Sequence, residues 1–133
     1  MYSESDRCDL FIAIDGDHVG DTLEYHLARC DLAQARGFSQ EVAHVIRELD
    51  QRLEQAGATV HFSGGDNLIA SMPKVAFEPR MLQDLPRQPC TFSVGLGWDS
   101  RSALMALKVA KALGRNQVFS MLGDDHTRKE VGG

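Results

Sequence analysis

The sequence contains no long apolar stretch. No segment approaches the ~18 consecutive apolar residues that a membrane-spanning helix requires. The first residues, MYSESDRCD, contain no apolar segment like the centre of a secretory signal. From these two absences we expect a cytoplasmic protein with no membrane partner.

Cysteine is also scarce. Cys8, Cys30 and Cys90 are odd in number and far apart, and none belongs to a Cys-x-x-Cys or histidine-pair spacing of the kind that binds zinc. The pattern argues against a disulfide framework and against a structural zinc site. It predicts three reduced thiols in the core.

Basic residues form no run long enough to follow a nucleic-acid backbone. The 133 residues include 14 lysines and arginines against 19 aspartates and glutamates, which gives a net charge of −5. We therefore expect no long nucleic acid as a partner. A nucleotide is compatible with this charge, because carboxylates gathered around a divalent cation make a protein acidic.

What the sequence does contain is the composition of one globular domain, with 43% hydrophobic residues. Apolar periodicity and the positions of glycine and proline predict its elements. In chain order we expect a strand at 9–15, a helix at 21–36 stopped by Gly37, a helix from the N-cap Ser39 to Gly57, a hairpin of strands 58–63 and 68–72, an irregular connection at 73–89 with room for one short helix, a strand at 91–97, a helix at 100–113 and an edge strand at 117–120.

This order of elements is typical of a ferredoxin-like α+β fold. It predicts an antiparallel-containing sheet with helices packed mainly on one face, in a single domain over residues 1–133. Residues 121–133 are mostly polar and are expected to form a flexible tail. In this topology the first strand and the hairpin are neighbours in the sheet.

Acidic residues end the first strand and occupy the hairpin turn. Asp15, Gly16 and Asp17 follow the strand, and Asp66 lies in the turn Gly64-Gly65-Asp66-Asn67. The turn alone has a structural explanation, because glycine and asparagine tolerate positive φ. Carboxylates brought together from two strands would repel each other, and Mg²⁺, which prefers oxygen ligands, would relieve that repulsion.

Basic and aromatic residues add further candidates. Lys108, Lys111 and Arg115 follow at i, i+3 and i+7, so they form one side of the last helix, as either a solvated face or a phosphate-binding face. His18 is either merely exposed or faces a nucleotide. Phe62, at a strand position, is expected in the core, with stacking on a base as the alternative.

Four segments together resemble a known family: FIAIDGDHVG (11–20), VHFSGGDNLIA (60–70), FSVGLG (92–97) and ALKVAKALGRNQV (106–118). They are similar to the minimal CRISPR polymerases, which are single palm domains. The palm is shared with the polymerase subunit of type III CRISPR complexes and with GGDEF nucleotide cyclases. The resemblance covers most of the chain and implies a palm fold.

The resemblance also implies roles for individual residues. The metal ligands would be Asp15, the Gly16 carbonyl and Asp66, holding Mg²⁺ with Mn²⁺ as a substitute, and Lys111 would act with the two acids in catalysis. One departure concerns Asn67, since the relatives carry an acid there and an amide oxygen supplies no charge. The nucleotide would be bound by Gly16, Asp17, His18, Gly64, Gly65, Asn67, Lys108, Lys111 and Arg115.

The implied activity is that of a nucleotidyltransferase that makes a cyclic oligonucleotide, of the cyclic di-AMP type, from ATP with release of pyrophosphate. By the same resemblance the product signals to a separately encoded effector in antiphage defence. Joining two triphosphates suggests a homodimer or a larger assembly. Two alternatives stay open: a GTP hydrolase like GTP cyclohydrolase III, which also carries Gly-Gly-Asp-Asn, and a degenerate palm that only binds nucleotide.

Overall fold

The computed structural model describes residues 9–123 of the chain. Five strands form one sheet in the order β2-β3-β1-β4-β5, in which β4 and β5 pair in parallel and all other neighbours are antiparallel. The predicted α+β class with an antiparallel-containing sheet is confirmed. The strands are β1 (Asp9–Gly16), β2 (Thr59–Gly64), β3 (Asn67–Pro73), β4 (Phe92–Gly97) and β5 (Val118–Ser120).

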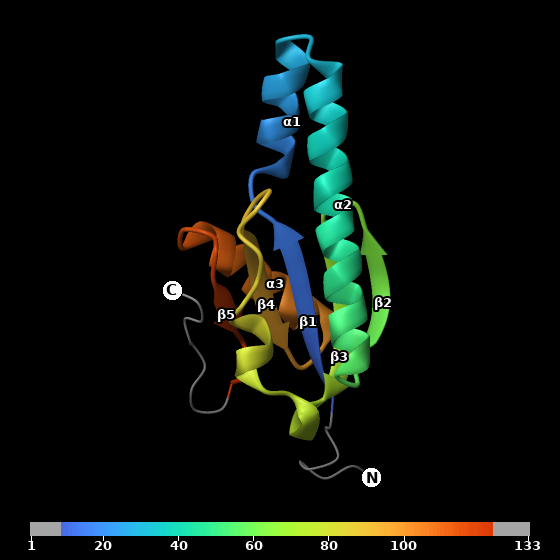
Figure 1. The fold of residues 1–133 in the computed structure, drawn as a ribbon. Helices are drawn as coiled ribbons and strands as arrows, with labels where there is room; N and C mark the ends of the chain where they lie inside the picture. The colour runs from blue at the N-terminus through green and yellow to red at the C-terminus, as the bar shows by residue number, and fades with distance from the viewer. Residues whose placement is uncertain (1–8, 124–133) are drawn as a thin grey trace.

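Three α-helices accompany the sheet: α1 (Val19–Ala28), α2 (Leu32–Gln55) and α3 (Ser100–Ala112). The first two form a hairpin that extends well beyond the end of the sheet, while the second half of α2 lies along the sheet (Figure 1). The predicted irregular connection between β3 and β4 contains two short 3-10 helices, η2 (Lys74–Ala76) and η3 (Pro79–Leu82).

The first two helices differ from the prediction. The expected helix over 21–36 ends at residue 28, and a single helix of 24 residues then runs through Gly37 and Ser39. The chain turns at Cys30, which has a φ of 59°, and the Asp31 side chain caps α2 by accepting a hydrogen bond from the Gln34 N–H. The break therefore lies before Asp31, and neither Gly37 nor Ser39 marks a helix boundary.

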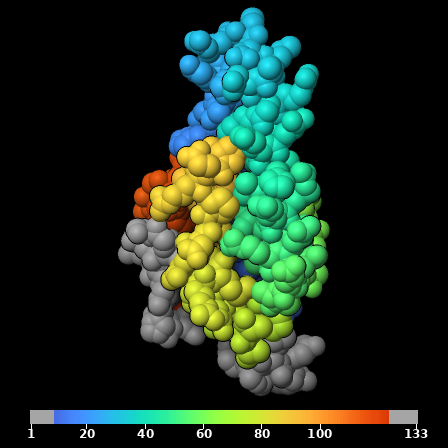
Figure 2. Space-filling view, viewed as in Figure 1, coloured from blue at the N-terminus to red at the C-terminus, as the bar shows by residue number. Residues whose placement is uncertain are grey.

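One face of the sheet carries the main core. Leu10, Ile12 and Ile14 of β1 are at most 1% exposed on this face, where they pack with the α2 residues Ile46 and Leu49. The regular apolar stripe of α2 buries against the sheet because residues at helical spacing share one side. In the space-filling view the connection between β3 and β4 lies against α2, and together they nearly hide β1 (Figure 2).

The other face is covered by α3. Ala13 of β1 packs there with Ala103 and Leu107, so the helices divide between the two faces rather than gathering on one. Two glycines of β4 allow this close approach: a Cβ on Gly95 would lie 2.2 Å from the Ala103 carbonyl oxygen, and one on Gly97 would lie 2.5 Å from the Ala103 nitrogen. Glycine at both positions lets the helix backbone contact the strand directly.

The remaining predictions concern the ends of the chain and the membrane. Most of the predicted flexible tail, 124–133 of 121–133, lies outside the described residues, and the single-domain assignment over 1–133 stays a prediction. Among residues 9–123, none of the helices has the length and apolar character needed to cross a bilayer.

Candidate active site

The end of β1 and the β2–β3 turn meet, as the sequence predicted. Asp15 pairs across the sheet with Asn67, and the Gly16 N–H donates a hydrogen bond of 2.8 Å to the Asp66 carbonyl oxygen. A Cβ added to Gly16 would lie 3.6 Å from the Cβ of Asp66. Two acids that are 51 positions apart in the sequence thus belong to one corner of the sheet.

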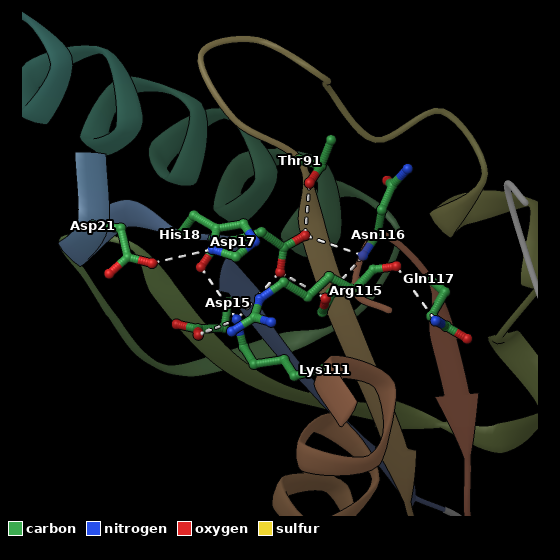
Figure 3. A network of polar contacts seen from close by, with 11 residues as sticks. Asp15, Asp17, His18, Asp21, Thr91, Lys111, Arg115, Asn116 and Gln117 are labelled. Atoms are coloured by element: carbon green, nitrogen blue, oxygen red, sulfur yellow. Dashed lines mark hydrogen bonds and ion pairs between the residues drawn. The ribbon is translucent and has the colours of Figure 1, made fainter. Parts of the chain in front are cut away.

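A lysine from α3 reaches the same corner. The Lys111 ammonium lies 2.9 Å from the Asp15 carboxylate, and it donates to the Gly16 carbonyl oxygen at 3.3 Å and to the Asp17 carboxylate at 3.2 Å. Figure 3 shows Lys111 extending from the end of α3 to this group of oxygens. A cation is therefore favoured at the end of β1.

Asp15 remains partly open to solvent, with 24% of its side chain exposed. Burial raises the pKa of its carboxyl above the ordinary value, and the negative charges of Asp66 and Asp17 act in the same direction. The hydrogen bond and charge of Lys111 oppose this effect but do not cancel it. The positive charge of Lys111 alone therefore does not bring the pKa of Asp15 back to its ordinary value.

Asp17 lies in the opposite environment, because only 1% of its side chain is exposed. Its carboxylate accepts hydrogen bonds of 2.7 Å from the hydroxyls of Thr91 and Ser93, and a third from the Asn116 N–H at 3.1 Å. Burial alone would raise the pKa of Asp17, but the hydrogen bonds from Ser93, Thr91 and Lys111 outweigh it and lower the pKa. Asp17 ties β1, β4 and the segment after α3 together.

Arg115 belongs to a loop and not, as its spacing predicted, to the helix. α3 ends at Ala112, and Arg115 and Asn116 both have positive φ angles, 66° and 56°. The Arg115 Nε is buried and has no hydrogen-bond partner among the described residues. Figure 3 shows its side chain extending from the loop toward the end of β1. An unpaired buried donor of this kind fits an anionic ligand.

Other predicted site residues surround this centre or lie outside it. His18 adopts a positive φ of 60° between β1 and α1, and its Nδ1 lies 3.3 Å from the Asp21 carboxylate in an exposed position. Gly65 has a φ of 59°, which its lack of a Cβ permits, and it forms the turn together with Gly64. Lys108 is exposed on α3, one turn before Lys111.

Sequence reasoning missed the residues that support the site. Thr91, Ser93 and the Asn116 backbone hold Asp17, and the only signal in the sequence was a serine inside the apolar strand TFSVGLG. Cys90 also lies here, since its Sγ would be 3.3 Å from a Cβ on Gly16, and burial raises the pKa of its thiol. Its placement beside the site follows from the fold and not from any cysteine spacing.

The oxygen atoms at this corner fit a hard divalent cation. The Asp15 carboxylate and the Gly16 carbonyl already share one positive group, Lys111 Nζ. Asn67 faces the same side as its cross-strand partner Asp15, and its Oδ1 is buried without a hydrogen-bond partner in the described part of the chain. Mg²⁺ typically uses one or two carboxylates and completes its six ligands with waters and phosphates. No group of three or more His, Cys, Asp or Glu residues suited to a metal occurs within residues 9–123.

An acidic strand end beside a Gly-Gly-Asp hairpin, with a lysine supplied by the next long helix, defines a palm domain related to nucleotide polymerases and cyclases. The chain belongs to the minimal CRISPR polymerase domain family, which it matches over residues 11–121. This confirms the family that the four sequence segments resemble. Among curated proteins, none matches the chain.

Solved structures with a similar fold include members of two groups. A chain of the Csm1–Csm4 cassette in complex with cA4 has a TM-score of 0.64 and 21% identity, over 90% of this chain and 22% of that chain. The cassette in complex with pppApApA gives 0.63 and 21%, over 94% and 23%. The GGDEF domain of DgcB from Caulobacter crescentus, in complex with c-di-GMP, gives 0.54 and 17%, over 84% and 77%. The chain spans about a fifth of the length of the cassette chains.

Proposed function

We propose that this protein is a nucleotidyltransferase that joins ATP molecules into a cyclic oligonucleotide and releases pyrophosphate. The observation that carries the proposal is the meeting of Asp15, the Gly16 carbonyl and Lys111 beside Asp66. Two acids and one ammonium group at the same end of the sheet support a site at which a metal ion and a triphosphate would bind together.

Mg²⁺ would be held by Asp15, the Gly16 carbonyl and Asp66, with Asn67 Oδ1 as a neutral oxygen nearby. When bound, the ion supplies acidification of the attacking hydroxyl and charge stabilisation on the phosphoryl oxygens. Mn²⁺ takes similar oxygen ligands and is expected to substitute. Asn67 carries no charge, so substrate phosphates contribute more of the negative charge here than in relatives with an acid at this position.

The basic side chains act on the triphosphate. Lys111 would exchange its contacts with Asp15 and Gly16 for the phosphates, and Arg115, whose Nε is unpaired, would bind the same group. Both cations then stabilise the charge that develops on the departing pyrophosphate. Asp17 does not contact the nucleotide in this scheme. Its hydrogen bonds keep Lys111 and the Arg115–Asn116 segment in place.

In the reaction a ribose hydroxyl oxygen of one nucleotide attacks the α-phosphorus of a second. The bond from that phosphorus to the bridging oxygen breaks, pyrophosphate leaves in line with the attack, and the hydroxyl proton passes to solvent. A second transfer of the same kind closes the ring. A metal ion held by these oxygens would acidify the attacking hydroxyl, so we assign no side chain as a general base.

Adenine is the proposed base because of the ligands of similar structures. The cassette structures were solved with cA4, pppApApA and one ATP, whereas the DgcB domain contained c-di-GMP. Cassette structures also give the higher TM-scores. We propose a cyclic di-AMP type of product, made by a homodimer or larger assembly and acting as an antiphage signal on a separately encoded effector in the cytoplasm.

The test is incubation of the purified protein with each nucleoside triphosphate and Mg²⁺, followed by mass spectrometry and nuclease mapping of the products. ATP should give a cyclic oligoadenylate and pyrophosphate. The Asp66→Ala variant should give none, while Asp84→Ala, which removes an exposed carboxylate outside the site, should match the wild type. Wild-type turnover by Asp66→Ala would refute the assignment of the site.

Asn67 favours one second candidate, since GTP cyclohydrolase III, which the sequence also resembles, carries the same Gly-Gly-Asp-Asn turn. That activity opens the base of GTP instead of joining nucleotides. The same incubation separates the two, because a ring-opened pyrimidine from GTP has a different mass from any cyclic nucleotide. Nucleotide binding without any product, in Mg²⁺ or Mn²⁺, would instead indicate a palm that only binds.

A further inference from the structure

Part of the sheet beside the active site is left uncovered on the face that carries Asp15. α3 packs on β4, β1 and β5 and extends little beyond β1, while α2 lies on the opposite face. The register sets Phe62 opposite Ile69, and Ile69 opposite Ala13, so these three side chains share the α3 face. Phe62 is 57% exposed there.

A β-bulge adds a second ring to this surface. The register shifts between Val60 and Phe62, so the side chains of the consecutive residues His61 and Phe62 both lie on the α3 face. In a regular strand they would lie on opposite faces. His61 stacks on Phe11 with ring centroids 5.9 Å apart and an interplanar angle of 19°. Its Nε2 lies 2.8 Å from the Ser71 hydroxyl, which fixes the ring. We call Phe11, His61, Phe62 and Ile69 the aromatic shelf.

The aromatic shelf adjoins the acidic corner, which is the end of β1 with Asp15 and the β2–β3 turn with Asp66. Asp15, Asn67 and Gly64 form the next row of the same face, one strand repeat of two residues or about 7 Å from the row of Phe62. The Phe62 ring also reaches the turn, since its Cζ lies 3.9 Å from the position of a Cβ on Gly64. A base stacked on the shelf would therefore lie close enough to Asp15 for its own ribose to reach that carboxylate.

The shelf and the phosphate-binding residues lie on opposite sides of Asp15. Lys111 and the Arg115 loop approach from α3 and β4, where Asp17 holds them, whereas the shelf belongs to β3 and β2. In an in-line displacement, the leaving group and the attacking oxygen occupy opposite sides of the phosphorus. If pyrophosphate leaves toward Lys111 and Arg115, the attacking ribose approaches from the shelf.

We propose that the aromatic shelf binds the base of the nucleotide that supplies the attacking hydroxyl. The inference rests on the proposed function, because it needs a reaction between two nucleotides. Bases stack on exposed aromatic rings with little regard for their identity. The His61 nitrogen that lies near Ser71 is engaged within the protein, so the shelf supplies affinity and position rather than a choice between adenine and guanine.

Fluorescence provides a binding test that needs no turnover. Phe62→Trp places an indole on the shelf, and Met105→Trp places one at a similarly exposed site, 51% against 57%, on α3. Both variants keep the native Trp98 as a common background. AMP in EDTA should quench Phe62→Trp saturably, ribose 5-phosphate should not, and Met105→Trp should respond to neither. Equal responses of the two variants to AMP would overturn the proposal.

Kinetics provide the second arm. Phe62→Ala should raise KM for ATP by about tenfold, which is the loss expected for one stacking contact. Phe62→Tyr should have a KM close to that of the wild type, because it keeps an aromatic ring. Met105→Ala should have the wild-type KM. An unchanged KM in Phe62→Ala refutes the shelf. A change of oligomeric state by light scattering with unchanged AMP binding refutes it too, since the shelf is then a contact between chains. Failure of the proposed function is recognised separately, by the absence of any wild-type product.

Discussion

The two faces of the sheet differ in how far their side chains are buried and in how polar they are. On the α2 face Leu10, Ile12 and Ile14 are fully buried in one apolar core, and α2 with the β3–β4 connection closes it (Figure 2). On the α3 face the cover is narrow, and Phe11, Phe62, Asp15 and Asn67 stay open or half-open. The main apolar core lies on one face and the proposed active site on the other, and substitutions can test whether stability and activity are separable.

The largest effect is expected from Asp66 on the α3 side. Asp66→Ala removes a proposed metal ligand from an otherwise intact turn, so product formation should fall by ~10³-fold or more, which corresponds to about 4 kcal/mol in the barrier. The melting temperature should change little, because Asp66 is half-exposed. Product assays paired with thermal melts measure both. A large loss of stability would show that the site also holds the fold together.

The converse substitution is on the α2 face. Ile46 is 2% exposed, and Ile46→Ala should reduce the free energy of unfolding by about 2–5 kcal/mol. The rate per folded molecule should stay unchanged, because Ile46 lies on the face opposite Asp15. Urea titration and turnover at low temperature give the two quantities. A large fall in the rate of folded protein would break the separation of the two faces.

Asp17 connects the two properties, because it is buried but holds the Lys111 and Asn116 segment. Asp17→Asn keeps the shape and removes the charge that the Thr91 and Ser93 hydroxyls stabilise, so we expect a loss of about 2 kcal/mol in stability. KM for ATP should rise, because Lys111 loses one of its partners. Thr22→Val, at a half-exposed position on α1, serves as a control for the general effect of a near-isosteric change.

Smaller effects test the helices themselves. Gly37 lies inside α2, and a Cβ added there meets nothing within 4 Å. Gly37→Ala should therefore stabilise the protein by about 0.5–1 kcal/mol, since alanine loses less backbone entropy in a helix. Chemical denaturation measures the change. Destabilisation would mean that the helix ends at Gly37, as the sequence pattern suggested.

The smallest effect is expected at the start of α3, where Asp99 accepts a hydrogen bond from the Ser102 N–H and has its pKa lowered by that bond. A lowered pKa in the folded state stabilises the protein above the unfolded value of 3.8, and this contribution disappears as the pH falls through the folded value. The gap in melting temperature between wild type and Asp99→Ala should be constant near neutral pH and close below pH 3.8.

The sequence predicted those parts of the molecule that depend on local pattern. Alternation and turn residues located the strands, and the pairing of β1 with the hairpin followed from the order of elements, so the meeting of Asp15 with the Asp66 turn was predictable. The break at Cys30 was not, because a non-glycine residue with positive φ has no distinct signal. Gly37, by contrast, carried a stop signal that the buried stripe of α2 overrides.

The interior of the site was not predictable for a different reason. Asp17 looked like a ligand-binding acid, but its partners Thr91, Ser93 and Asn116 are 74 to 99 positions away and meet it only in the folded protein. Arg115 followed the helical spacing of Lys108 and Lys111, yet the helix ends before it. Periodicity describes a regular element well, but it fails where the chain leaves that element.

The ammonium of Lys111 has a further consequence for handling the protein. By bridging Asp15, the Gly16 carbonyl and Asp17, it gives the acidic corner an internal counter-charge. We therefore expect the protein to fold without a bound metal ion. Chelators should abolish the proposed activity without unfolding the protein. Zinc fingers and similar domains behave differently, because their folding depends on the bound ion.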